Sequence, residues 1–107
     1  MSFDELKEAV HKYTYDVLYR LKIMDCAPDM VQIGNEIRSG MLFPDGAVPQ
    51  YRQLAALVNE GIRAVRELLP ETKVMIHLDQ GGRYNCIMPW FDSMFNAGML
   101  PIDAIGL

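Results

Sequence analysis

The sequence predicts an α/β protein in which helices alternate with parallel strands, in the order α-β-α-β-α-β. Two short apolar segments, 29–37 and 73–79, are rich in β-favouring residues and run into polar ones, and a third, 102–107, begins at the end of the chain. Helical apolar periodicity fills the intervals before and between these segments. Because each interval holds a helix of ten residues or more, the connections are crossovers and the three strands are parallel.

The first predicted helix begins at a capping box, in which the Ser2 hydroxyl accepts from the backbone N–H of Glu5 and the Glu5 carboxylate reaches back. Apolar side chains then recur every three or four residues. They are Phe3, Leu6, Val10, Tyr13, Val17 and Leu21. We expect this helix to end near Asp25, ahead of Pro28.

The segment from Asp29 to Ile37 is an apolar run that ends abruptly in an amide and a carboxylate. In parallel α/β proteins, ligands bind at the C-terminal ends of the strands. Strand alternation places Asn35 and Glu36 on opposite faces, so both side chains reach one ligand only if the strand ends or bulges there. We therefore expect the strand to bulge or end at this point.

A loop with glycine and proline, 38–46, leads to a second helix that we predict from about Pro49 to Leu69. Its inner stripe consists of Leu54, Leu57, Val58, Ile62, Val65 and Leu68. Gly61 lies on the same side, at a cost of about 1 kcal/mol relative to alanine. We expect it to permit a close approach between helix and strand.

The second predicted strand, 73–79, separates its side chains by face. Val74, Ile76 and Leu78 share the apolar face, and Met75, His77 and Asp79 share the other.

The third predicted helix covers roughly Cys86 to Ala97, with Gly98 in its C′ position. Its apolar positions are Ile87, Trp90, Phe91, Met94 and Phe95.

The composition describes one globular unit and argues against several functions. The chain has 107 residues, half of them hydrophobic, and a net charge of −4 without a basic stripe, which argues against nucleic acid binding. Its apolar runs fall short of the roughly 18 residues of a membrane helix, and no signal peptide is recognisable. Cys26 and Cys86 form no CxxC motif, and we expect two free thiols. We expect no metal and no cofactor.

Four motifs spread over nearly the whole chain are specific in combination. They are Pro28-Asp-Met-Val-Gln-Ile-Gly-Asn-Glu36, Gly40-Met-Leu-Phe-Pro-Asp-Gly46, Val74-Met-Ile-His-Leu-Asp79 with Gly81-Gly82, and Asp103-Ala-Ile-Gly-Leu107. Together they resemble the arabinogalactan endo-β-1,4-galactanase family. The resemblance implies a TIM (β/α)₈ barrel, of which residues 1–107 would form a single partial segment from about helix three to strand six.

The resemblance also implies a retaining glycoside hydrolase that cleaves internal β-1,4-galactosidic bonds of galactan or arabinogalactan, secreted or at the cell surface. Glu36 matches the general acid/base, and Asn35 matches the neighbour that contacts the sugar at the cleavage point. His77 and Asp79 match polar residues that line the same cleft. These four residues and the aromatic Phe43 are the predicted site.

Two positions depart from the family pattern. Phe43 stands where the family usually carries a tryptophan, which keeps an aromatic platform but reduces its stacking area. Asp25 stands where a glycine usually ends the first helix, which is tolerable because aspartate visits the left-handed region at some cost.

The resemblance places the family's nucleophile, a second glutamate, in the seventh barrel strand, beyond the 107 residues. A retaining glycosidase needs two carboxyl groups about 5–5.5 Å apart, so we expect this chain alone to be inactive. We also expect it to self-associate, because barrel-facing side chains lose their cover. Two alternatives stay open. One is a non-catalytic half barrel that at most binds sugar or assembles with itself, and the other is a different retaining barrel hydrolase, such as a mannanase.

Overall fold

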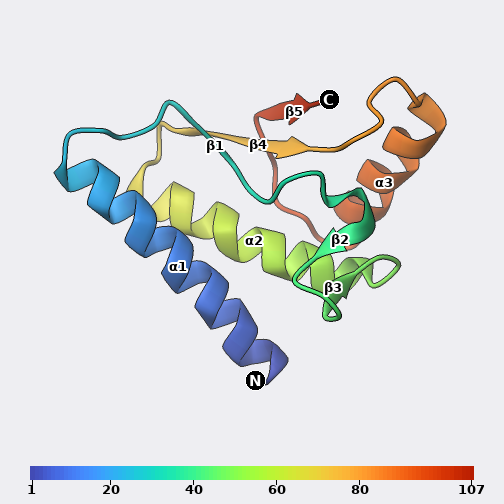
Figure 1. The fold of residues 1–107 in the computed structure, drawn as a ribbon, viewed down its shortest axis with the longest axis horizontal. Coiled ribbons are helices and arrows are strands. Elements are labelled where there is room, and N and C mark those ends of the chain that lie inside the picture. The colour runs from blue at the N-terminus through green and yellow to red at the C-terminus, as the bar shows by residue number, and fades with distance from the viewer.

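The computed structural model describes all 107 residues and confirms the alternation of helices with parallel strands (Figure 1). The helices are α1 (Phe3–Ile23), α2 (Tyr51–Leu68) and α3 (Tyr84–Asn96). The strands β1 (Met30–Gln32), β4 (Lys73–His77) and β5 (Ala104–Gly106) form one parallel sheet, with β4 in the middle. None of the three helices combines the length and the hydropathy that a membrane-spanning helix needs.

α1 begins at the predicted capping box. The Ser2 hydroxyl accepts from the Glu5 backbone N–H, and the Glu5 carboxylate accepts from the Ser2 backbone N–H, each at 3.1 Å. The helix ends at Ile23, and Asp25 follows with a φ of 56°. This left-handed conformation is the one that aspartate tolerates in place of glycine.

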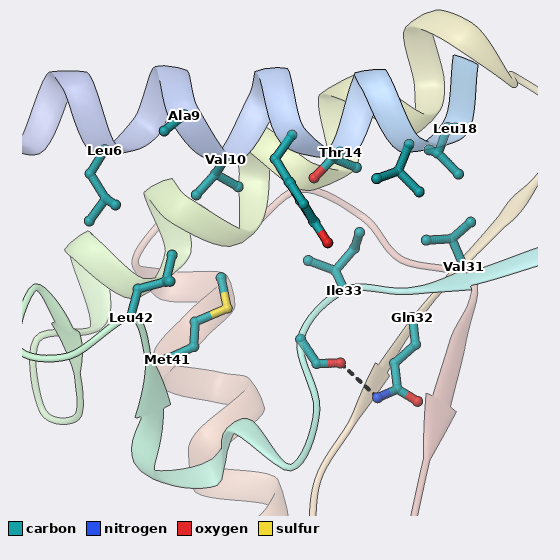
Figure 2. A pocket seen from close by; sticks show the side chains of 13 residues that line it. Leu6, Ala9, Val10, Thr14, Leu18, Val31, Gln32, Ile33, Met41 and Leu42 are labelled. Carbon is teal, nitrogen blue, oxygen red and sulfur yellow. Dashed lines mark hydrogen bonds between the residues drawn. The ribbon is translucent and has the colours of Figure 1, made fainter. Parts of the chain in front are cut away.

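The apolar stripe of α1 is only partly buried, which corrects the simple amphipathic prediction. Leu18 is the one buried residue of α1, whereas Tyr13 and Val17 are 73% and 41% exposed. α1 packs on α2, where His11 Nε2 lies 3.1 Å from Glu67 Oε2. Its remaining apolar face borders a groove beside β1 (Figure 2). A stripe is buried only where a second element covers it, and no strand lies on the outer side of β1.

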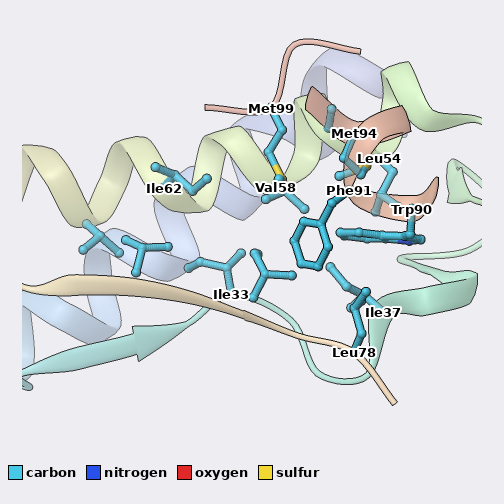
Figure 3. Close-up of a cluster of buried hydrophobic side chains, with 14 of the residues drawn as sticks. Ile33, Ile37, Leu54, Val58, Ile62, Leu78, Trp90, Phe91, Met94 and Met99 are labelled. Carbon is cyan, nitrogen blue, oxygen red and sulfur yellow. The ribbon is translucent and has the colours of Figure 1, made fainter. Parts of the chain in front are cut away.

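The core lies between the sheet and the helices α2 and α3 (Figure 3). The whole predicted stripe of α2 is buried, namely Leu54, Leu57, Val58, Ile62, Val65 and Leu68. The helix-side positions of β4 and its extension are fully buried as predicted, namely Val74, Ile76 and Leu78. Burial of these side chains supplies the main driving force that holds α2 on the sheet.

Gly61 marks the closest approach of α2 to the first strand segment. A Cβ atom at this position would lie 3.0 Å from Ile33 Cγ2 and 3.2 Å from Ile33 Cδ1. Such contacts are tighter than ordinary van der Waals packing. The expectation that Gly61 permits a close helix-to-strand approach is therefore confirmed.

α3 starts two residues earlier than predicted and ends as predicted. The backbone N–H of Gly98 donates to the Phe95 carbonyl at 3.1 Å, and that of Met99 donates to the Met94 carbonyl at 3.0 Å. With a φ of +100° at Gly98, these two bonds form a Schellman motif. Four of the five predicted apolar positions are buried, but Phe95 is 46% exposed.

The loop after β1 is more regular than predicted. It contains a short 3₁₀ helix, Ile37–Ser39, and a small antiparallel hairpin of β2 (Gly40–Met41) and β3 (Gly46–Ala47). A Cβ atom on Gly40 would clash with the Gly46 carbonyl, and one on Gly46 would clash with the Met41 carbonyl. The two glycines therefore let the hairpin strands approach each other.

Asp103 joins β5 to β4 at the start of the last strand. Its Oδ2 atom accepts from the Val74 backbone N–H at 2.8 Å and lies 3.0 Å from Arg66 Nη1. The hydrogen bond from Val74, followed by the interaction with Arg66, lowers the pKa of the Asp103 carboxyl below its usual value.

The face of the sheet opposite the helices is open. Met30 is 42% exposed, and Gln32, Met75 and His77 are half-buried. Gly106 belongs to the same face, because a Cβ atom there would lie 2.9 Å from Met75 Sδ and 3.4 Å from His77 Cβ. The polar ends of β1 and β4 therefore meet on an uncovered surface.

Candidate functional site

β1 ends before Asn35 and Glu36. This is one of the two conditions under which both side chains could reach the same ligand. β1 stops at Gln32, Gly34 has a φ of +73° and Glu36 has a φ of +50°. Both residues turn the chain in the left-handed region, so strand alternation no longer separates Asn35 from Glu36. Two neighbouring polar side chains thus follow the C-terminal end of a parallel strand.

Asn35 accepts hydrogen bonds from both strands. Gln32 Nε2 donates to the Gly34 carbonyl at 2.7 Å and to Asn35 Oδ1 at 2.9 Å, and His77 Nδ1 lies 3.2 Å from the same oxygen. An amide oxygen only accepts, so the proton of this contact must sit on His77 Nδ1. In the neutral ring, Nε2 is then left as an acceptor.

Asp79 is held by a cation from the loop after β1. Arg38 Nε lies 3.2 Å from Asp79 Oδ1, and Arg38 Nη2 lies 3.3 Å from Asp79 Oδ2. The two side chains are 35% and 32% exposed. This bidentate geometry fixes the plane of the Asp79 carboxylate. It forms the second link between the loop after β1 and the end of β4.

Glu36 differs from its neighbours because its carboxylate makes no hydrogen bond or ion pair and is exposed. Its backbone, with φ and ψ both 50°, is left-handed. A residue other than glycine pays on the order of 1–3 kcal/mol for such a conformation, and strain of this kind clusters at functional sites. The carboxylate is therefore free to meet a ligand.

No hydrogen bond, ion pair or ring stacking links Phe43 to the other predicted site residues. It lies in the turn between β2 and β3, is 65% exposed and stacks on no other aromatic ring. No group of three or more His, Cys, Asp or Glu side chains is arranged to hold a metal ion. Cys26 and Cys86 are free thiols, as expected.

The whole chain, residues 1–107, matches the family model described as glycosyl hydrolase family 53. The chain belongs to glycosyl hydrolase family 53. Over its full length it is 44% identical to a Niallia circulans protein described as "Uncharacterized protein in bgaB 5'region". Over 94% of its length it is 32% identical to an arabinogalactan endo-beta-1,4-galactanase of Thermothelomyces thermophilus.

A solved family 53 structure has the same fold. The Ignisphaera aggregans GH53 catalytic domain superposes on 98% of the chain with a TM-score of 0.92 and 38% identity. The chain spans 31% of each of the two curated relatives and 29% of this solved chain. The predicted fold class is confirmed. The chain is part of an α/β barrel, with three helices alternating with three parallel strands.

Two residues of this family 53 segment join the predicted side chains without having been assigned to the site. Gln32, in the first predicted strand, donates from Nε2 to Asn35 Oδ1. Arg38, in the predicted loop 38–46, binds Asp79. A lone cation two residues after Glu36 is a weak signal, because pairing over 41 residues depends on tertiary structure.

Proposed function

We propose that this chain is part of a retaining endo-β-1,4-galactanase and that Glu36 is its general acid/base. Membership of family 53 and the 32% identity to a named galactanase support the reaction class. The observation that carries the assignment is the exposed, unpartnered carboxylate of Glu36, on a strained backbone at the C-terminal end of a parallel strand. Ligands bind at this end of barrel strands.

In the first step of this reaction, the Glu36 carboxylic acid gives its proton to the glycosidic oxygen. A second carboxylate attacks the anomeric carbon, and the bond to the leaving sugar breaks. In the second step, the Glu36 carboxylate takes a proton from water, which attacks the same carbon and releases the nucleophile. The second carboxylate would come from outside the 107 residues, so the chain alone would not turn over.

The other polar residues would hold the sugar. Asn35 Oδ1 is occupied by Gln32 and His77, which leaves the Asn35 NH₂ group to donate to a sugar hydroxyl. His77 presents Nε2 as an acceptor. Asp79, oriented by Arg38, keeps lone pairs on both oxygens for further hydroxyl groups. Donors and acceptors in fixed positions are what recognition of a neutral polysaccharide requires.

We further propose that residues 1–107 correspond to about helix three to strand six of the complete barrel. The substrate would be β-1,4-galactan or arabinogalactan, and the complete enzyme would be secreted or bound at the cell surface. Neither nucleic acid nor a membrane is expected as a partner.

The test is Glu36→Gln in the full-length enzyme, with Glu8→Gln as the matched control on the exposed side of α1. General acid catalysis contributes about 10²–10⁴-fold. We expect turnover on polymeric galactan to fall by that factor in Glu36→Gln and to stay unchanged in Glu8→Gln. The loss should be smaller on aryl galactosides whose leaving groups need no proton.

Wild-type turnover in Glu36→Gln would refute the acid/base assignment. Measuring mannan beside galactan separates the substrate from the mechanism. If the wild-type enzyme cleaves mannan but not galactan, the proposed substrate is wrong and the role of Glu36 stands.

A further inference from the structure

Gln32 reaches the turn after β1 through the NH₂ group of its side chain. Gln32 Nε2 donates to the Gly34 carbonyl at 2.7 Å, as the dashed line in Figure 2 shows, and to Asn35 Oδ1 at 2.9 Å. The nitrogen has two hydrogens, one for each of these bonds, and both of its partners are oxygens. The last residue of β1 is thus tied to the turn that carries Asn35 and Glu36.

The Gly34 carbonyl decides how the Gln32 amide is oriented. The two ends of an amide group have nearly the same shape, so the surrounding groups determine which end is the NH₂ and which is the oxygen. A backbone carbonyl only accepts, so the end of Gln32 that meets Gly34 must be the NH₂ group. Gly34 also packs tightly on the buried Ile37, since a Cβ atom on Gly34 would lie 2.7 Å from Ile37 Cγ2. This packing limits how far the carbonyl can move.

Gln32 in turn decides how the Asn35 amide is oriented. Because the Gln32 NH₂ group donates to it, the near end of the Asn35 side chain must be its oxygen. His77 Nδ1 lies 3.2 Å from the same oxygen, but it does not settle the orientation, because a neutral histidine ring can donate or accept at Nδ1. The direction of the hydrogen bonds therefore passes from Gly34 through Gln32 and Asn35 to His77.

We infer that Gln32 is a positioning residue, which sets the donor and the acceptor that Asn35 and His77 present to the sugar. With Gln32 in place, the Asn35 NH₂ group is the donor and His77 Nε2 is the acceptor, and neither makes a hydrogen bond within the chain. The contacts join β1 and β4, which are paired neighbours in the sheet. The sugar rests on the proposed galactanase function, whereas the order of the hydrogen bonds does not.

Gln32→Glu tests this inference, because a carboxylate has nearly the shape of the amide but only accepts. Asn35 should then turn its NH₂ group toward the new carboxylate and toward His77 Nδ1, which becomes an acceptor. Gln32→Met removes the donor without supplying an acceptor in its place. Asn96→Asp is the matched control, since it makes the same amide-to-carboxylate change at an exposed residue of α3.

The first measurement is NMR of the imidazole nitrogens in the full-length enzyme, at a pH where the His77 ring is uncharged. We expect the Nδ1–H form of His77 in the wild-type enzyme and in Asn96→Asp, and the Nε2–H form in Gln32→Glu. Gln32→Met should give a mixture of the two forms, because nothing then orients Asn35. Circular dichroism checks that each variant is folded. A residue that only supported the fold would not reverse the tautomer.

The second measurement is calorimetry with galacto-oligosaccharides. In Gln32→Glu the donor and the acceptor exchange places while the rest of the cleft is unchanged, so a sugar hydroxyl group bonded to them loses a matched partner. One neutral hydrogen bond contributes about two- to tenfold in affinity, and we expect Gln32→Glu to weaken binding by that factor. The ligand is uncharged, so the added carboxylate does not repel it. Asn96→Asp should bind as the wild-type enzyme does.

Three results would overturn the inference. They are a His77 that keeps the Nδ1–H form in Gln32→Glu, equal tautomer ratios in Gln32→Glu and Gln32→Met, and an unchanged affinity in a Gln32→Glu enzyme whose His77 tautomer has reversed. Failure of the proposed function looks different. In that case Glu36→Gln keeps its turnover on galactan, or the wild-type enzyme has none, although the His77 tautomer still reverses in Gln32→Glu.

Discussion

His77 Nδ1 lies 3.2 Å from Asn35 Oδ1, so a side chain at the end of β4 contacts the residue beside Glu36. This contact sets which ring nitrogen of His77 carries the proton. The other histidine has the opposite arrangement, since His11 uses Nε2 to reach Glu67 Oε2 at 3.1 Å. The chain therefore holds two histidines with different proton positions in their neutral rings.

NMR of the imidazole nitrogens tests this pair. We expect the neutral Nδ1–H form for His77 and the neutral Nε2–H form for His11 at a pH where both rings are uncharged. Asn35→Ala should shift His77 toward the Nε2–H form, which is the common one in water, and leave His11 unchanged. If His77 kept its tautomer in this variant, Asn35 would not be what orients the ring.

Phe43 is expected to meet the sugar although no hydrogen bond, ion pair or ring stacking links it to the other site residues. Stacking on a pyranose ring depends on aromatic area. In the full-length enzyme, Phe43→Trp should tighten binding of galacto-oligosaccharides modestly, and Phe43→Ala should weaken it, as measured by calorimetry. Equal affinities for all three proteins would remove Phe43 from the binding site. Tyr84→Ala, at another exposed aromatic residue, is the control for nonspecific effects.

Gly61→Ala should destabilise the chain although alanine is the better helix former. The helix gains about 1 kcal/mol, but overpacking costs about 1–3 kcal/mol, and the new methyl group would lie 3.0 Å from Ile33 Cγ2. We expect a net loss of about 1 kcal/mol in denaturant unfolding. Because Ile33→Ala removes the opposing atoms, the double variant should lose less than the sum of the single ones. Additive losses would show that the two positions do not press on each other.

The lowered pKa of Asp103 predicts a pH dependence of stability. A carboxyl group whose pKa is lower in the folded chain stabilises that chain above its unfolded pKa, and this contribution is lost as pH falls through the folded pKa. Asp103→Asn should therefore reduce stability near neutral pH. The difference from the wild-type chain should shrink as pH falls below 3.8. A difference that stays constant from pH 6 to pH 2 would contradict this linkage. Asp4→Asn, at an exposed residue of the first turn of α1, serves as the control.

The sequence predicted those elements whose apolar side chains are buried in the core. The stripe of α2 and the alternation from Val74 to Leu78 are buried as expected, because both patterns face a single core. It did not predict the partial exposure of α1, since periodicity records which side is apolar but not whether anything covers it. The links from Arg38 to Asp79 and from Gln32 to Asn35 were also missed, because they depend on how the chain turns after β1.

The two links between the loop after β1 and the end of β4 join residues 41 and 42 positions apart, and α2 lies between them. The shortest continuous piece that holds all the polar residues of the site thus runs from Gln32, at the end of β1, through α2 to Asp79, two residues after β4. A single protease cut inside α2 would place Asn35 and His77 on different polypeptides. A design that moves the site into another barrel would therefore have to transplant this whole segment.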